Sequence, residues 1–217
     1  MHTGTDSLDY NELCKKIFGS TLDETVNNFN DGASVVLELP AENYFLISSK
    51  FIKHLTNNGL EGIYLSFQRP YDNISNLFKK YNINKHKISI IDCLCNEKID
   101  KNIKENTKNQ NYKFERIIDK IINKLNQIKG EKKFIIIDSL TTICLYKSEP
   151  EIKRFTELLI KKIFYKNKNI YVFFNVAEDL VKKQFIKDIS KNSDKVINIV
   201  QYAKKYSQDV IDFSVLT

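Results

Sequence analysis

Residues 134–142 read Phe-Ile-Ile-Ile-Asp-Ser-Leu-Thr-Thr, and this stretch decides the fold. Four apolar residues, three of them β-branched, are followed at once by an acid and by hydroxyl side chains. A short continuous apolar run is typical of a strand buried on both faces, as in a parallel sheet. An acid at the end of such a strand is typical of an aspartate directed toward magnesium. Many parallel strands also end in Asp for structural reasons, so Asp138 alone does not define a site.

Similar apolar runs occur on both sides of this stretch and alternate with segments of helical period. The alternation predicts an α/β fold, namely a three-layer domain with a mainly parallel sheet and helices on both faces. The predicted strands are residues 34–39, 62–67, 87–92, 133–138, 169–175 and 195–200. A last run, residues 209–216, alternates apolar and polar side chains, which predicts a C-terminal antiparallel edge hairpin with the preceding strand.

Helices are predicted between the strands from apolar residues spaced three and four apart. The longest covers residues 114–128, and Gly130 is expected to stop it. Ser148 and Glu151 form a capping box that begins another helix. Further helices are expected around residues 45–55 and 74–81. Residues 1–30 are assigned to an N-terminal helical appendage and 31–217 to the α/β domain, in which the polar segment 96–111 is predicted to be a mobile loop.

Composition places the chain among ordinary globular proteins. Hydrophobic residues make up 42% of its 217 residues and charged residues 28%, and no apolar run approaches the roughly 18 residues of a membrane helix. The four cysteines are scattered and no signal-peptide pattern is present, so we expect a cytoplasmic protein without membrane contact. The formal charge of +7 suits a polyanion, but the lysines are spread along the whole chain. A solvated lysine surface is therefore favoured over a nucleic-acid groove.

The turn after the first predicted strand is where a nucleotide-binding α/β domain holds phosphates with backbone N–H groups, glycines and a lysine. Here residues 39–46 read Leu-Pro-Ala-Glu-Asn-Tyr-Phe-Leu, with neither glycine nor lysine. Glu42 would place a negative charge near a phosphate, and the ring of Tyr44 would fill space that the phosphate needs. The structural interpretation is that Pro40 ends the strand and that Asn43 or Glu42 caps the helix.

The second candidate position is the end of the second predicted strand, where open α/β sheets place ligand groups. Residues 64–71 read Tyr-Leu-Ser-Phe-Gln-Arg-Pro-Tyr. A base that activates water would be a carboxylate here, and neither Gln68 nor Arg69 is a base. Arg69 either pairs with Glu42 or Asp138, which we favour, or binds a phosphate or carboxylate.

Two other sets of residues form no recognisable site. Cys93 and Cys95 lie on the same side of an extended chain, but no second cysteine pair or nearby histidine completes a metal site. His2, His54 and His86 are isolated from any nucleophile with a partner acid. No metal ligand and no catalytic residue is therefore predicted.

The order and spacing of these elements resemble the RecA/KaiC-like ATPase superfamily over about residues 30–200. The resemblance rests on residues 36–37, 62–67 followed by Pro70, Ile83 with 87–94, 135–142 and 194–197. In active members of this superfamily, the turn after the first strand is a glycine-rich Walker A loop with Lys and Thr. Catalytic glutamates follow the second strand, and a later strand, Walker B, ends in an aspartate. Only Asp138 and Ser139 match that pattern. The turn at residues 42–46 and the pair Gln68-Arg69 do not.

More narrowly, residues 39–44, 68–71 and 138–146 look similar to archaeal KaiC-like proteins that also lack Walker A. This resemblance implies a degenerate pseudo-ATPase without a cofactor. The positions of its vestigial site would be Glu42, Asn43, Gln68, Arg69, Asp138 and Ser139.

Three functional hypotheses follow. The first is a non-catalytic RecA/KaiC-like module that acts through a protein partner or as a homo-oligomer, in regulation or signalling. The second is a divergent ATPase or sensor in which Arg69 and Asp138 bind ATP with magnesium, or another small anion. The third is a nucleic-acid-binding protein, whose affinity would fall steeply with salt.

Overall fold

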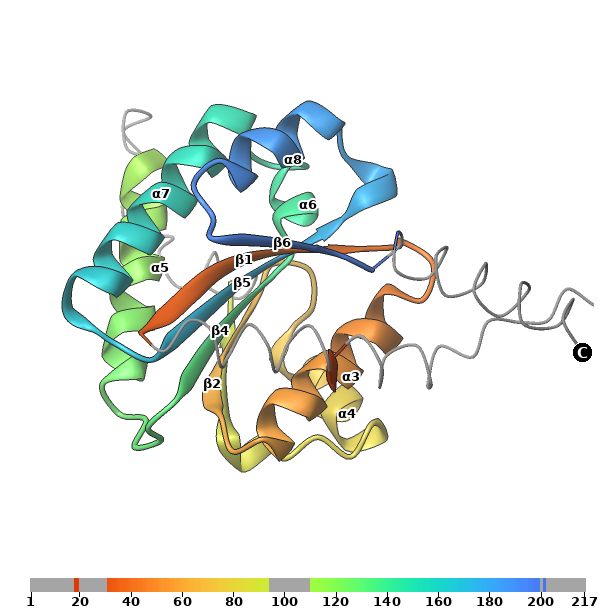
Figure 1. The fold of residues 1–217 in the computed structure, drawn as a ribbon, viewed down its shortest axis with the longest axis vertical. Helices are drawn as coiled ribbons and strands as arrows, with labels where there is room; N and C mark the ends of the chain where they lie inside the picture. Colours follow the sequence, from red (N-terminus) through yellow and green to blue (C-terminus); the bar gives the residue numbers. More distant parts are fainter. Residues whose placement is uncertain (1–17, 20–30, 94–109, 200, 202–217) are drawn as a thin grey trace, which may run out of the picture.

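A six-stranded parallel sheet divides the protein into layers in the computed structural model, which describes residues 18–19, 31–93, 110–199 and 201 (Figure 1). Its strands are β1 (Gly32–Leu39), β2 (Glu61–Ser66), β3 (Ile88–Asp92), β4 (Lys133–Asp138), β5 (Ile170–Ala177) and β6 (Lys195–Asn198). They lie in the order β3-β2-β4-β5-β1-β6. Every pair is parallel, so the carboxyl ends of all six strands lie along one edge of the sheet.

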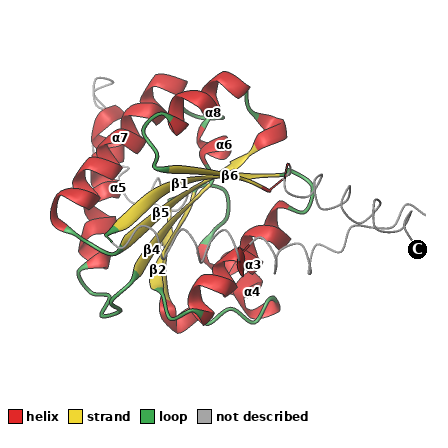
Figure 2. Cartoon of the chain, viewed as in Figure 1, coloured by secondary structure: helices red, strands yellow, loops and turns green. Residues whose placement is uncertain are grey.

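Helices cover both faces of this sheet (Figure 2). The main ones are α3 (Tyr44–Asn57), α4 (Tyr71–Lys80), α5 (Gln110–Leu125), α6 (Leu140–Ile143), α7 (Glu149–Lys166) and α8 (Lys183–Ser190). Helices α3 and α4 lie on one face, and α5, α6, α7 and α8 lie on the other. The predicted three-layer α/β fold is therefore confirmed.

Strand alternation builds two cores, because successive side chains of a strand point to opposite faces. In β4, Phe134 and Ile136 join the core under α3 and α4. Ile135 and Ile137 join the core under α5 and α7. All four side chains are fully buried, which explains why the strand reads as an unbroken apolar run.

Two predicted limits around helix α5 need correction. Helix α5 ends at Leu125, before the predicted limit of residue 128 and well before Gly130. The last turn tightens there, because the N–H groups of Gln127 and Ile128 donate to carbonyls three residues back. The predicted loop 96–111 lies outside the described residues, except that residues 110–111 already belong to α5.

Other predicted features are confirmed or lie outside the description. The Glu151 carboxylate accepts from the N–H of Ser148, as the capping box predicts. Of the predicted N-terminal appendage, buried Phe18 packs edge-on against Phe51 of α3, with 5.3 Å between ring centroids. The remainder of that appendage and the predicted strand 209–216 lie outside the described residues.

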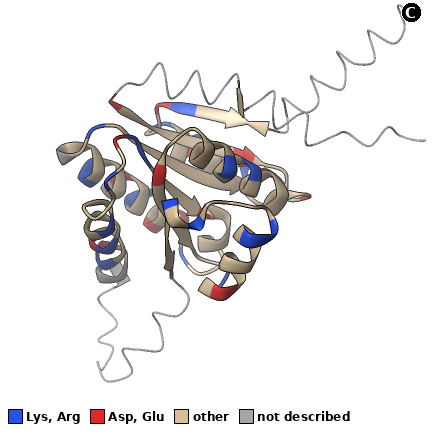
Figure 3. Ribbon diagram, turned by 90° about the horizontal axis from the view of Figure 1, so that it is seen from below, with Lys and Arg blue, Asp and Glu red and all other residues tan. Residues whose placement is uncertain are grey.

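Lysine and arginine residues occur on helices of both helical layers rather than in a single strip (Figure 3). No helix in the described part of the chain is both long and apolar enough to cross a membrane.

Candidate functional site

The carboxylate of Asp138, at the end of β4, is the centre of the candidate site. Its side chain is completely buried, with 0% of its surface exposed. The hydroxyl of Tyr44 donates a hydrogen bond to Oδ1, and the hydroxyl of Tyr64 donates to Oδ2. Both carboxylate oxygens are therefore held by tyrosine side chains of this chain.

The strand register explains why these three residues meet. Ser66 of β2 lies opposite Asp138 of β4, so Tyr64, two residues earlier, points to the same face of the sheet as Asp138. That face is covered by α3, whose first residue is Tyr44. A buried tyrosine needs a partner for its hydroxyl, and the strand-end acid is the partner that this face offers.

Burial controls the ionisation of this cluster. It raises the pKa of Asp138 above its usual value, while the bonds from Tyr44 and Tyr64 and the charge of Arg69 lower that pKa in part. Burial and the nearby Asp138 charge raise the pKa of both tyrosines well above their usual value. The two hydroxyls therefore keep their protons and act as donors toward the acid.

Further polar side chains extend this cluster across the same face. The amide of Asn175, on β5, is fully buried and donates to the hydroxyl of Ser48 on α3, with 3.2 Å between Nδ2 and Oγ. Asn175 also lies close enough to Tyr44 to lower its pKa through a hydrogen bond. Hydrogen bonds between side chains thus link α3 to the ends of β4 and β5.

The turn between β1 and α3 lacks the features of a phosphate cradle. It spans only residues 40–43, and its Ala41 N–H already donates to Oδ2 of Asp179 at 3.1 Å. Glu42 and Asn43 are exposed. Asn43 is the N-cap residue of α3 and has a φ of 61°, a left-handed conformation that Asn tolerates better than most residues.

Part of the structural prediction for this turn is confirmed. Strand β1 ends at Leu39, directly before Pro40, and Tyr44 is buried in the core under α3. Asn43 occupies the predicted N-cap position of α3, but its side chain makes no capping hydrogen bond. The left-handed backbone of Asn43 instead turns the chain into the helix.

Arg69 and Gln68 lie beside the cluster without completing a catalytic arrangement. The predicted ion pair of Arg69 with Glu42 or Asp138 is absent from the described residues. Instead the Arg69 guanidinium lies 3.7 Å from the centre of the Phe45 ring, a cation–π contact that leaves its charge acting on Asp138 at longer range. Gln68 Oε1 accepts from the Thr142 hydroxyl at 3.3 Å.

Ser139 has a structural role in this arrangement. Its Oγ accepts from the N–H of Thr142 at 3.2 Å and thereby caps the short helix α6. The structure therefore brings Gln68, Arg69, Asp138 and Ser139 together, whereas Glu42 and Asn43 face solvent.

Tyr64, like Asn175, is a member of the cluster that the sequence reasoning missed. A signal for it exists, because a tyrosine within an otherwise apolar buried strand requires a hydrogen-bond partner. The identity of that partner depends on the neighbouring strand, which only the fold supplies.

A second acidic group lies at the same edge of the sheet. The Asn198 amide at the end of β6 donates to Oε2 of Glu38 on β1 and to Oε2 of Glu178 after β5. Burial is the main cause that raises the pKa of Glu38, and the charge of Glu178 adds to it. Among the described residues, no group of three His, Cys, Asp or Glu side chains is arranged to hold a metal ion.

The residues at the carboxyl ends of the strands do not fit the arrangement in which such sheets usually bind ATP with magnesium. Magnesium would need an oxygen of Asp138, whose side chain is fully buried and whose two oxygens each accept a hydrogen bond from a tyrosine hydroxyl. The phosphates would need free N–H groups in the β1–α3 turn, where the Asp179 carboxylate takes one and Glu42 adds negative charge.

The fold places the protein in the class of three-layer α/β domains with an all-parallel sheet. No protein-family model matches the chain, and no curated protein matches it in sequence.

Among solved structures, the chain is similar to the flagellar accessory protein FlaH from Methanocaldococcus jannaschii. The TM-score is 0.51 with 15% identity, over 82% of this chain and 76% of that one. It is also similar to the KaiC-like protein PH0186 from Pyrococcus horikoshii OT3, with a TM-score of 0.48 and 16% identity, over 73% of this chain and 68% of that one.

Proposed function

We propose that this chain is a non-catalytic RecA/KaiC-like module, a pseudo-ATPase that acts through protein contacts in regulation or signalling. The observation that carries the proposal is the closure of the Asp138 carboxylate by Tyr44 and Tyr64. An aspartate that binds magnesium for phosphoryl transfer needs an oxygen open to the ion and its waters. Here the acid is buried and serves as the acceptor of a structural hydrogen-bond cluster.

Two further features support the proposal. The β1–α3 turn has neither the glycines nor the lysine that hold phosphates, and Arg69 stacks on Phe45 at the position where a catalytic carboxylate would be needed. The sequence resemblance to archaeal KaiC-like proteins without Walker A agrees with the loss of the phosphate-binding turn. A module that keeps this fold but does not hydrolyse ATP still has surfaces that can bind other proteins, including copies of itself.

A phosphate-release assay tests the loss of catalysis. Purified protein with Mg-ATP is expected to release phosphate no faster than the buffer blank, and Asp138→Asn is expected to behave the same. Circular dichroism would establish that the variant is folded, and Arg69→Ala serves as a second variant outside the buried cluster. Release that scales with protein concentration and disappears in Asp138→Asn and Arg69→Ala would contradict the proposal.

Native mass spectrometry tests the competing hypothesis of a modified ligand site. The freshly purified protein is expected to have the mass of the polypeptide, as a monomer or oligomer. A bound nucleotide or small anion that is present in the wild type and absent in Arg69→Ala would favour the divergent sensor instead.

A further inference from the structure

Among the described residues, strand β3 forms an open edge of the sheet. It is the outermost strand beside β2, and no described strand pairs with its other side. Edge strands present unpaired backbone groups that can pair with another chain. This edge is separate from the Asp138 cluster, which lies at the carboxyl ends of the strands.

The direction of the backbone groups follows from one hydrogen bond. The N–H of Cys93 donates to the carbonyl of Ser66 on β2 at 2.9 Å. Because alternate residues of a parallel strand bond to the same neighbour, the N–H and C=O of Ile90 point away from β2. Neither group has a partner among the described residues, so Ile90 offers one donor and one acceptor to an incoming strand.

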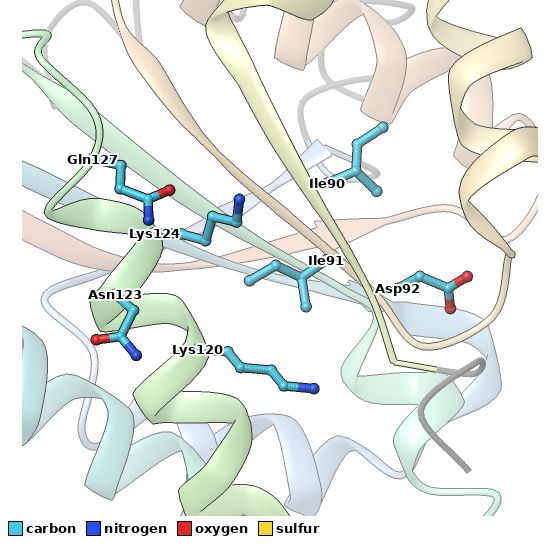
Figure 4. A pocket seen from close by; sticks show the side chains of 7 residues that line it. All are labelled: Ile90, Ile91, Asp92, Lys120, Asn123, Lys124 and Gln127. Atoms are coloured by element: carbon cyan, nitrogen blue, oxygen red, sulfur yellow. The ribbon is translucent and has the colours of Figure 1, made fainter. Parts of the chain in front are cut away.

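Two shallow cavities follow this edge on either side of the strand. The first, of about 330 Å³, is lined by Ile90, Ile91, Asp92, Lys120, Asn123, Lys124 and Gln127 (Figure 4). The second, of about 350 Å³, is lined by Tyr71, Ser75, Lys85, His86, Ile88, Ser89, Ile90 and Lys124. Since Ile90 and Lys124 line both, the two cavities border one continuous length of the edge.

The charge along this edge is predominantly positive. Lys120 and Lys124 project from α5 beside β3 in Figure 4, and Lys85 lines the cavity on the other side. The acid that lines this edge is Asp92, whose Oδ2 accepts from the Tyr71 N–H at 3.0 Å. The edge thus combines free backbone groups with lysines, which favours an extended partner of negative charge.

We propose that the β3 edge binds an extended, negatively charged peptide segment of a partner protein, which adds to the sheet as a further strand. Backbone hydrogen bonds to Ile90 would hold the segment in register. Its acidic side chains would lie near Lys85 and Lys124, and its apolar side chains would contact the isoleucines of β3. The inference rests on the proposed function in protein contacts and states where the contact forms and with what chemistry.

A fluorescence-anisotropy titration tests this proposal with a labelled octapeptide in which Glu alternates with Val. Matched peptides carry Gln or Lys in place of Glu. The Glu peptide is expected to bind more tightly than the Gln peptide and far more tightly than the Lys peptide. The difference should shrink as salt is raised, because exposed charges are screened.

Two variants separate the backbone contact from the charges. Ile90→Pro removes the outward N–H without touching the bonds to β2, whereas Ile90→Val keeps it. Lys85→Glu with Lys124→Glu reverses the charge of the edge, and its matched control reverses two exposed lysines elsewhere, Lys161 and Lys187. Thermal unfolding would show that each variant is folded.

We expect Ile90→Pro to abolish binding of the Glu peptide and Ile90→Val to retain it. The edge reversal should weaken binding by at least about fivefold at low salt, and the control reversal by less than about twofold. Absence of binding by the Glu peptide would overturn the inference, since the lysines would then only protect the edge from aggregation. Equal binding to wild type and to the folded Ile90→Pro and edge-reversed variants would overturn it as well.

These outcomes are independent of the proposed loss of catalysis. Phosphate release that depends on Asp138 would refute the proposed function without changing peptide binding. A failure of peptide binding would leave the result of the phosphate assay unchanged.

Discussion

Replacing Tyr44 with Phe removes one of the two hydroxyl groups that hold the buried Asp138 carboxylate, while the ring stays in place. The lost bond is charge-assisted and leaves a carboxylate oxygen without its donor in a site that is 0% exposed. Such losses cost about 1.5–3 kcal/mol in the free energy of unfolding. For a chain of this length, the midpoint of thermal unfolding should fall by about 3–12 °C.

The pH dependence of this effect has a defined sign. The Tyr44 bond lowers the pKa of Asp138 against the larger effect of burial, which shows that it favours the charged acid. Its removal therefore raises the pKa of Asp138 further. The stability difference between Tyr44→Phe and wild type should be largest above the pKa of Asp138 in the folded protein. It should shrink as the pH falls through that value and the acid becomes neutral.

Urea unfolding at several pH values measures the effect, with Tyr165→Phe as the matched control. Tyr165 is 80% exposed, so its hydroxyl should contribute no more than about 0.5 kcal/mol. Tyr64→Phe should behave like Tyr44→Phe, and the double variant should be non-additive because both hydroxyls bind the same carboxylate. A loss for Tyr44→Phe no larger than that for Tyr165→Phe would refute the account of a structural Asp138 cluster.

Two further predictions concern the other titratable groups. Glu38→Gln should raise the free energy of unfolding at pH 7–8, because burial and the Glu178 charge raise the pKa of Glu38 and so disfavour its charged form in the folded state. The new amide oxygen can still accept a hydrogen bond from Asn198, and the gain in stability should vanish when the pH falls below the ordinary Glu pKa. Urea unfolding at several pH values measures this gain, and its absence at pH 8 would contradict the prediction. Burial and the Glu149 charge raise the pKa of Cys144 to about 11, so iodoacetamide should alkylate it at pH 8 about 100-fold more slowly than an ordinary cysteine. Peptide mapping by mass spectrometry checks this, and a rate equal to that of a reference cysteine peptide would count against it.

The alternation of apolar runs predicted the sheet well because strand formation here depends on local pattern. Residues 134–137 are apolar on both faces, and helices cover both faces of β4. The limits of the helices were less predictable. Helix α5 ends at Leu125 because its last turn tightens, although Ile128 continues the apolar spacing. Spacing identifies the buried face of a helix and not the residue at which its hydrogen bonds end.

The candidate site could be predicted in part. The absence of glycine and lysine from residues 39–46 already argued against a phosphate cradle, and the ring of Tyr44 was expected to fill that space. The bonds to Asp138 could not be predicted, because Tyr44 and Tyr64 lie 94 and 74 residues away in sequence. Their meeting depends on strand order and register, which bring β2 next to β4.

The cation–π contact of Arg69 with Phe45 could not be predicted from charge alone. Charge alone favours an ion pair with Glu42 or Asp138, yet Glu42 is exposed and both oxygens of Asp138 accept from tyrosine hydroxyls. The guanidinium lies instead over the Phe45 ring. A sequence shows which charges are present, but burial decides which of them can pair.

Isothermal titration calorimetry with ATP, in the presence and absence of magnesium, tests the central claim most directly. No stoichiometric binding is expected in either condition, because Tyr44 and Tyr64 bind the buried Asp138 carboxylate and the β1–α3 turn lacks a phosphate cradle. Stoichiometric binding of Mg-ATP that is lost in a folded Asp138→Ala variant would contradict it.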